Sequence, residues 1–275
     1  YPSMRLFRQA KVGDWGSVVE RVGEAIGELH RDRAFVRSLN RRVAAAKAEY
    51  EPDVASLMRR VLRPGDTFVD VGANVGRHTV LAAALVGHGG EVIAIEPGEN
   101  ALPALRSATE KLPQVTIVER PAWNEADEAL TFHLCADDSG GNAAWDPGEF
   151  ATNTHSRANP QARVLETVTL DRIVSAKTPR LIKIDVEGAE QRVLEGASDL
   201  LSGPARPPFI IAELHEFGLA KLGCSQASLR ALMASRGYST FFIFADGSLP
   251  QLVPDQTAIK SQLIFNILFS TPAAV

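Results

Sequence analysis

From residue 67 onward, hydrophobic positions fall into short apolar runs that alternate with longer stretches of helical spacing. Such alternation is typical of βα units built around a parallel sheet. Because the runs are apolar almost throughout, we expect helices to cover both faces of that sheet. We therefore predict an α/β fold with about seven strands. The predicted strands are Phe68–Val71, Val92–Ile95, Val115–Val118, Leu181–Ile184, Phe209–Ala212, Thr240–Phe244 and Leu263–Leu268, and the predicted helices cover residues 77–87, 99–111, 188–201 and 225–236.

A helical block is predicted ahead of the sheet. Apolar residues recur at the spacing of one buried helix face after Pro52, which suits a first helical turn. These residues are Val54, Leu57, Met58, Val61 and Leu62, and a looser helical period runs upstream through Leu29, Phe35, Val36, Leu39 and Val43. The sequence Arg63–Asp66 then turns the chain. We predict an N-terminal helical extension over residues 1–63, which makes a homodimer plausible, and one domain over 64–275.

The interval between Val118 and Leu181 does not follow the βα rhythm. Residues 130–134 and 164–170 alternate like two paired strands, and residues 136–160 between them are rich in Gly, Asn, Asp, Ser and Pro. Long loops in compact domains are usually functional or disordered. We predict a lid-like insertion at about residues 120–170.

Composition narrows the class of protein. The 275 residues are 45% hydrophobic and 23% charged, which excludes a mainly disordered chain. Two cysteines, Cys135 and Cys224, are too few for a disulfide framework and indicate reduced thiols in a cytoplasmic protein. No apolar run reaches the ~20 residues that a membrane span requires.

Charge is distributed unevenly along the chain. The net charge is +5 over residues 1–63 and −9 over the remainder. An acidic body is a poor binder of polyanions, so the sequence disfavours a nucleic-acid substrate.

One turn contains residues that are suited to binding a cofactor. The strand at Phe68–Val71 contains Asp70 and leads through Gly72, Asn74 and Gly76 into a helix. Glycine permits backbone conformations and close approaches that larger residues prevent, and the helix start offers free N–H groups. Asp70, at the carboxyl end of the strand, can accept hydrogen bonds or face the cationic part of a ligand.

Two classes of cofactor compete for this turn. A dinucleotide-binding enzyme uses G-x-G-x-x-G to hold a pyrophosphate, whereas this turn has an acid two residues before its first glycine. Such an acid suits an α-amino group. Glu96 ends the next strand and is placed to bond ribose hydroxyls, a role that NAD-binding folds also use. Together Asp70 and Glu96 favour S-adenosylmethionine over NAD, and an NAD-linked oxidoreductase remains the alternative.

Several segments together resemble the FkbM family of class I S-adenosylmethionine-dependent methyltransferases. Asp70–Gly76 resembles motif I of the class, and Lys183–Glu190 is the most specific segment. The others are Ile95–Pro97, Thr169–Asp171, Leu181–Ile182 and Val193–Ala197, so that the matching region runs from about Pro64 to Leu214. The resemblance implies a Rossmann-like sheet of seven strands with the last antiparallel, and methyl transfer to a hydroxyl oxygen.

The resemblance also implies roles for individual residues. Glu96 would bind the ribose hydroxyls, and Pro121, Ala122 and Trp123 would border the adenine, where Trp123 either stacks on the ring or fills the core. The methionine and ribose portions would be lined by Asp70, Gly72, Ala73, Asn74 and Gly76.

Methyl transfer to an alcohol also needs a group that removes or polarises the hydroxyl proton. In the family interpretation Asp185, Glu213 and His215 face the active site, with His215 the best base by its ordinary pKa. The two carboxylates alternatively hold a divalent cation such as Mg²⁺, and Asp185 alternatively caps a helix. His133, His155 and Asp137–Asp138 are candidate substrate contacts.

The function predicted is an S-adenosylmethionine-dependent O-methyltransferase. Its acceptor is expected to be a hydroxylated small molecule, namely a sugar, a glycoside or a polyketide-like natural product. A non-catalytic S-adenosylmethionine-binding protein is a further alternative. Methylation of amino groups in nucleic acid or protein is disfavoured, since the sequence lacks an Asn/Asp-Pro-Pro-Tyr/Phe motif.

Overall fold

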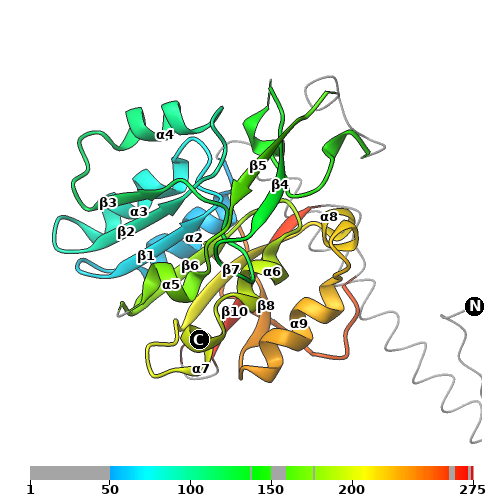
Figure 1. Ribbon diagram of the computed structural model, residues 1–275. Coiled ribbons are helices and arrows are strands. Elements are labelled where there is room, and N and C mark those ends of the chain that lie inside the picture. The colour runs from blue at the N-terminus through cyan, green and yellow to red at the C-terminus, as the bar shows by residue number, and fades with distance from the viewer. Residues whose placement is uncertain are drawn as a thin grey trace, which may run out of the picture.

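The computed structural model describes residues 50–136, 138–149, 159–175, 177–259, 264–271 and 274. The helical pattern predicted around Leu29–Val43 lies outside these residues, as do Asp137 and His155. Figure 1 shows a central sheet with helices packed on it. No helix among the described residues has the length and apolarity to cross a membrane.

The central sheet has the predicted, mostly parallel topology. Its eight strands lie in the order β3-β2-β1-β6-β7-β10-β8-β9. β1, β2, β3, β6 and β7 pair in parallel, and β10 runs antiparallel between β7 and β8. The strands are β1 Thr67–Val71, β2 Glu91–Ile95, β3 Val115–Val118, β6 Pro179–Ile184, β7 Phe209–Leu214, β8 Ser239–Phe242, β9 Gln251–Val253 and β10 Phe265–Ser270.

The predicted fold class is therefore confirmed, including the antiparallel last strand. The edge strand β9 is an addition to the seven strands predicted, and it pairs antiparallel with β8. Its three residues lie between Pro250 and Pro254, which interrupt any longer apolar run. The sequence there carries little strand signal, because a proline cannot donate to a strand ladder.

The structure has more helices than the sequence predicts. Residues 188–201, predicted as one helix, form two. The chain breaks at Gly196, where a Cβ atom would lie 2.0 Å from the carbonyl oxygen of Trp123. α5 and α8 were not predicted. The helices are α2 Pro52–Val61, α3 Arg77–Val86, α4 Leu102–Thr109, α5 Leu170–Val174, α6 Glu190–Glu195, α7 Ser198–Ser202, α8 Glu216–Lys221 and α9 Gln226–Ser235.

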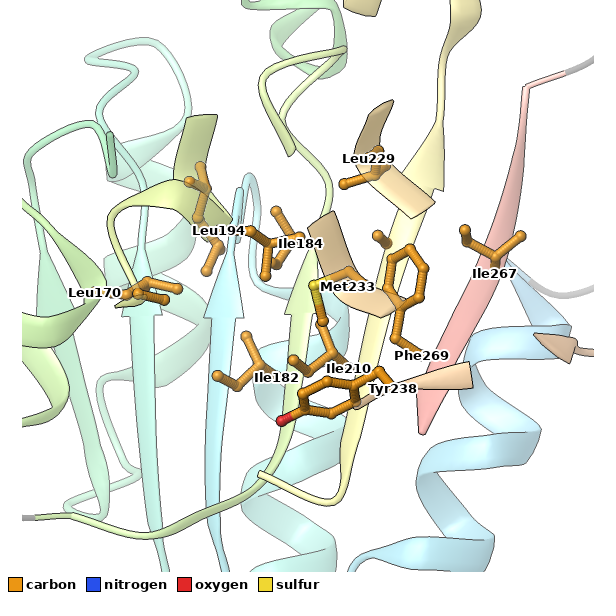
Figure 2. Close-up of a cluster of buried hydrophobic side chains, with 14 of the residues drawn as sticks. Leu170, Ile182, Ile184, Leu194, Ile210, Leu229, Met233, Tyr238, Ile267 and Phe269 are labelled. Carbon is orange, nitrogen blue, oxygen red and sulfur yellow. The ribbon is translucent and has the colours of Figure 1, made fainter. Parts of the chain in front are cut away.

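Both faces of the sheet are covered, as predicted. Along β6, Leu181 packs with α2 and α3 on one face, whereas Ile182 and Ile184 pack with α5, α6 and α9 on the other. Figure 2 shows the second face, where Leu229 and Met233 of α9 join side chains of β6, β7 and β10. Burial on both faces explains the near-continuous apolar runs.

The amphipathic helix predicted after Pro52 is confirmed as α2. Its residues Val54, Leu57, Met58 and Val61 are buried in the same cluster as Phe68 of β1. α2 is thus part of the core of the sheet domain. The division at residues 63 and 64 stays a prediction.

The paired strands predicted in the insertion are confirmed as a separate hairpin of β4 Ala129–Leu134 and β5 Gln161–Glu166 (Figure 1). The second predicted strand was too long at its end. Thr169 instead caps α5, and its Oγ1 accepts a hydrogen bond of 3.3 Å from the N–H of Arg172. Two short 3₁₀ turns, Ser139–Gly141 and Pro147–Glu149, follow β4.

Asp171 links α5 to the start of α7. Its carboxylate accepts hydrogen bonds from the N–H groups of Asp199, at 2.9 Å, and Leu200, at 2.8 Å. These N–H groups have no partner within their own helix.

We expect Asp171→Ala to lower the free energy of unfolding by about 1–2 kcal/mol, because it removes an acceptor from two helix-terminal donors. Urea unfolding followed by circular dichroism measures this. Asp171→Asn keeps one acceptor oxygen and should lose less. Equal stability of wild type and Asp171→Ala would contradict the capping role.

Candidate active site

A cavity of about 470 Å³ opens at the carboxyl ends of β1, β2, β6 and β7. The chain passes from β3 at one edge back to β6, which lies on the other side of β1. Such a reversal of strand order leaves a crevice beyond the strand ends, where open α/β sheets bind ligands. The cavity therefore lies at the carboxyl ends of the strands, and its role as the binding site stays a prediction.

The turn between β1 and α3 forms one wall of the cavity. Its backbone is left-handed at Gly72 (φ 80°), Asn74 (φ 47°) and Gly76 (φ 86°). At Gly72 a Cβ atom would lie 1.8 Å from the carbonyl oxygen of Asp185. Only glycine fits at that position, because the turn is pressed against the end of β6. Gly72, Ala73 and Asn74 line the cavity, whereas Gly76 packs against Leu105 of α4.

Asp70 presents one free carboxylate oxygen in this wall. The residue is 1% exposed, and its Oδ2 accepts a hydrogen bond of 2.6 Å from Thr79. Its Oδ1 is buried and has no hydrogen-bond partner among the described residues. A buried acceptor without a donor is costly. Asp70 therefore fits a ligand that brings its own donor, such as an ammonium group.

Glu96 is held in place by backbone amides. Its Oε2 accepts from the N–H of Asn74 at 2.8 Å, and its Oε1 accepts from the N–H of Gly98 at 2.7 Å. Burial raises the pKa of Glu96 to about 7, although these two hydrogen bonds act in the opposite direction. Each carboxylate oxygen keeps a further lone pair for a ligand hydroxyl.

The far end of the cavity is less polar. Pro121, Ala122 and Trp123 line it, as predicted, and Leu130 and Phe132 of β4 add an apolar surface from the insertion. The backbone of Trp123 is fixed by a hydrogen bond from its N–H to the carbonyl of Val168 at 2.9 Å. This end suits a flat, largely apolar group.

The three predicted catalytic residues occupy different places. Asp185 and Glu213 line the cavity, and burial raises the pKa of each carboxyl. His215 does not line the cavity and is 2% exposed. Its Nδ1 lies 3.1 Å from Glu187 Oε2, and its ring meets Trp145 edge-on at 5.8 Å. Of the three residues, His215 is therefore the one that does not face the cavity.

Sequence reasoning missed a charged group beside Asp185. Lys183 lines the cavity, and its Nζ lies 2.8 Å from Asp185 Oδ2 and 3.7 Å from Glu51 Oε2. Glu51 in turn contacts His78 Nε2 at 2.6 Å. The sequence does contain a signal for Lys183, because a charged residue there interrupts an otherwise apolar strand. It contains none for Glu51, because that residue lies in the block before the resembling segments.

The insertion closes over part of the site. Ser139 donates a hydrogen bond of 2.7 Å to the side chain of Asn74, and Trp145 Nε1 donates one of 2.6 Å to the carbonyl of Glu187. Asp138 lines the cavity, but His133 does not. These contacts hold the insertion against the cavity wall, and its role as a lid stays a prediction.

Within the part of the chain that the structure describes, two groups of side chains could together bind a metal ion. Their ligand atoms lie within 4.8 Å of one another, and both groups include Glu213. The groups are Glu187 with Glu213 and His215, and Glu51 with Asp185 and Glu213.

Comparison with known proteins gives a family match. Residues 70–240 match the model of the methyltransferase FkbM domain. Hexuronic acid methyltransferase AglP of Haloferax volcanii is 27% identical over 169 residues, which are 60% of this chain and 62% of that protein. The chain therefore spans less than two thirds of the length of that relative.

Solved structures with a similar chain path are more distant. The O-methyltransferase from Bacillus cereus is 14% identical, with a TM-score of 0.43 over 88% of this chain and 91% of its own. Fibrillarin from Aeropyrum pernix, with S-adenosyl-L-methionine bound, is 10% identical, with a TM-score of 0.43 over 80% of this chain and 76% of its own.

Glu190 below the cavity makes the stability of the fold depend on pH. Its Oε1 accepts from the N–H groups of Val186 and Gly188, each at 3.1 Å, and burial raises its pKa to about 8. In the unfolded chain the pKa returns to about 4.5. The folded state therefore holds this proton to higher pH than the unfolded state, and the resulting stability is lost as pH rises towards 8.

We expect Glu190→Gln, which mimics the protonated form, to gain stability relative to wild type as pH rises from 5 to 8, by on the order of 1 kcal/mol per pH unit. Urea unfolding at pH 5.5, 7 and 8.5 measures the difference. Glu195→Gln on the same helix is the control and should show no such trend. Parallel stability profiles for wild type and Glu190→Gln would contradict the shift.

Proposed function

Because the chain belongs to the FkbM methyltransferase family, we propose that it transfers a methyl group from S-adenosylmethionine to a hydroxyl oxygen of a sugar or similar small molecule. The observation that carries this proposal is the pairing of Asp70 and Glu96 on one wall of the cavity. Asp70 Oδ1 has no donor among the described residues, and the Glu96 carboxylate is fixed by backbone amides.

The residues that line the cavity match S-adenosylmethionine along its whole length. Asp70 Oδ1 takes the α-ammonium group, and the turn at Gly72–Asn74 lies against the methionine portion. Glu96 accepts the ribose hydroxyls, and Ala122 and Trp123 border the adenine. The excess of acid in the cavity complements the positive charge of the ligand.

When bound, S-adenosylmethionine supplies an electrophilic methyl carbon, so the protein's tasks are alignment and removal of the acceptor's proton. We propose that Asp185 accepts the proton of the acceptor hydroxyl. It lines the cavity, and burial raises its pKa, which makes it a stronger base than an exposed aspartate. Glu213 lies beside it and His215 behind, in contact with Glu187. His215 is then a second proton acceptor, reached through a carboxylate.

Arg77 favours an acceptor with a negative charge. It lines the cavity and is exposed, and its guanidinium lies 4.6 Å from the ring centroid of Tyr50. No carboxylate among the described residues pairs with it, in contrast to Lys183 and His78. Its charge is thus available at the rim of an otherwise acidic cavity. A uronic acid, the acceptor class in the name of the Haloferax volcanii relative, would place its carboxylate there.

The NAD-linked alternative is weaker on this geometry. A pyrophosphate would face Asp70, a buried acid that lies two residues before the first glycine of the turn. A non-catalytic role assigns no task to Asp185 and Glu213, which line the cavity beside the cofactor wall. Cys135 and Cys224 are buried and form no disulfide among the described residues, in keeping with the cytoplasmic location that we propose. A homodimer stays a prediction.

We expect wild-type protein to transfer radiolabelled methyl from S-adenosylmethionine to p-nitrophenyl β-D-glucuronide in preference to p-nitrophenyl β-D-glucoside. Arg77→Gln should raise KM for the glucuronide roughly tenfold and change KM for the glucoside little, because it removes one charge-assisted hydrogen-bond donor.

Arg106→Gln, an exposed arginine of α4 outside the cavity, is the matched control. Transfer to neither sugar would refute the acceptor class. Binding of NAD but not of S-adenosylhomocysteine in calorimetry would refute the function itself.

Cofactor binding should depend on the ionisation of Glu96. Its pKa in the free protein is about 7, and ribose hydroxyls favour the ionised carboxylate, so binding releases protons and affinity rises with pH. We expect the affinity for S-adenosylhomocysteine, measured by calorimetry, to rise roughly tenfold between pH 6 and pH 8. Glu96→Gln should bind more weakly and with little dependence on pH. The same pH profile in that variant would assign the titration to another group.

A further inference from the structure

Lys183 is a buried cation at the wall of the cavity. It lies on β6 between Ile182 and Ile184 and is 2% exposed, yet it lines the cavity. Burial disfavours an ammonium group, but the carboxylates of Asp185 and Glu51 outweigh burial and raise the pKa of Lys183 above its usual value. Lys183 therefore remains charged at neutral pH.

The Lys183 ammonium has N–H donors that no described residue uses. A lysine carries three N–H donors. Among the described residues Lys183 makes one hydrogen bond, of 2.8 Å to Asp185 Oδ2, and Glu51 Oε2 at 3.7 Å lies beyond hydrogen-bond distance. A buried charged donor without an acceptor is costly, and an oxygen of a ligand in the cavity would relieve that cost.

Glu51 is fixed opposite Lys183 by two other elements. Its Oε2 contacts His78 Nε2 of α3 at 2.6 Å, and its Oε1 accepts from Asn266 Nδ2 of β10 at 2.8 Å. Its backbone is left-handed, with φ 42°. Burial alone would raise its pKa, but Lys183, His78 and Asn266 together lower it to about 2. Glu51 is thus a permanent anion, and it lies before the residues that match the family model.

We propose that Lys183 is a catalytic residue whose ammonium donates a hydrogen bond to the acceptor hydroxyl oxygen and stabilises the negative charge that develops there, and that Glu51 is a positioning residue for Lys183. This inference rests on the proposed methyl transfer. As the acceptor oxygen bonds to the methyl carbon, the carbon–sulfur bond breaks with its electron pair left on sulfur. The hydroxyl proton passes to Asp185 Oδ1, while Oδ2 keeps its bond to Lys183.

Lys183 fills the role that a divalent cation would otherwise have. It lies within 3.7 Å of two of the three carboxylates in the group of Glu51, Asp185 and Glu213. A divalent cation bound there would meet a like charge at short range in a buried site. Since the surrounding acids repel a developing oxyanion, a cation is needed at this wall, and the chain supplies one.

The inference can be tested by binding and by turnover together. We expect Lys183→Met to lower kcat for p-nitrophenyl β-D-glucuronide by roughly 10²–10³-fold. Its Kd for S-adenosylhomocysteine should stay within about threefold of wild type. Sinefungin carries a cationic amine at the position of the methyl group. Removing the Lys183 charge should therefore tighten sinefungin relative to S-adenosylhomocysteine by roughly tenfold in Kd, as measured by calorimetry.

Three further variants provide a control, a charge-conserving substitution and an alternative if Lys183→Met does not fold. Lys177→Met is the matched control, because Lys177 pairs with Glu91 outside the cavity, and it should match wild type. Lys183→Arg keeps the charge, so it should keep the wild-type ratio of sinefungin to S-adenosylhomocysteine affinities and recover part of kcat. If Lys183→Met does not fold, Lys183→Gln, which keeps hydrogen-bond donors for Asp185 but carries no charge, should show the same relative tightening of sinefungin.

Glu51→Gln alone tests the positioning role. It should lower kcat roughly tenfold with KM unchanged, and Glu51→Asp should recover part of that loss.

The outcomes separate this inference from the proposed function. If the sinefungin ratio in Lys183→Met equals that in Lys177→Met, Lys183 does not face the reacting centre and the inference is overturned. If wild type methylates neither sugar but the ratio shifts, the acceptor class is wrong and the place of Lys183 stands. Loss of wild-type turnover on exhaustive chelation, restored by Mg²⁺, would overturn the claim that Lys183 replaces a metal.

Discussion

The ion pairs of Lys183 hold the candidate site together. Asp185, Glu51, Glu187 and Glu213 gather at the carboxyl ends of β6 and β7 and around the start of α2, where burial strengthens their mutual repulsion. A single ammonium on β6 offsets that repulsion from within the sheet. Breaking a buried pair of this kind leaves an uncompensated charge. The geometry of the acceptor side therefore depends on Lys183, whatever the cavity binds.

The cofactor side depends on a steric constraint. Gly72 allows the turn after β1 to touch the carbonyl of Asp185, which ties the first strand to the end of β6. The same turn places the N–H of Asn74 on Glu96 at the end of β2. One glycine thus brings the ends of three strands together. Asp185, which we propose accepts the proton, therefore contacts the turn at Gly72, which we propose binds the cofactor.

Much of this arrangement could be predicted from the sequence. The apolar runs gave the sheet because its strands are buried on both faces, and Asp70, Glu96, Asp185 and Glu213 were placed at strand ends by topology alone. What could not be predicted depends on tertiary packing. At Gly196, between α6 and α7, a side chain would collide with the carbonyl of Trp123, which lies far away in sequence. His215 follows β7 and does not line the cavity, and periodicity does not determine which of the side chains at a strand end face a cavity.

Glu51 shows the same limit most clearly. In sequence it is an acid before a proline, which suggests only a helix start. In the structure it meets α3, β6 and β10, and none of these contacts is local. The domain that matches the family model at residues 70–240 therefore does not contain every charged group of its own cavity. Since α2 is packed into the same core, the segment before the matched domain is a structural part of the site, and a boundary drawn at residue 64 separates Lys183 from the anion that holds it.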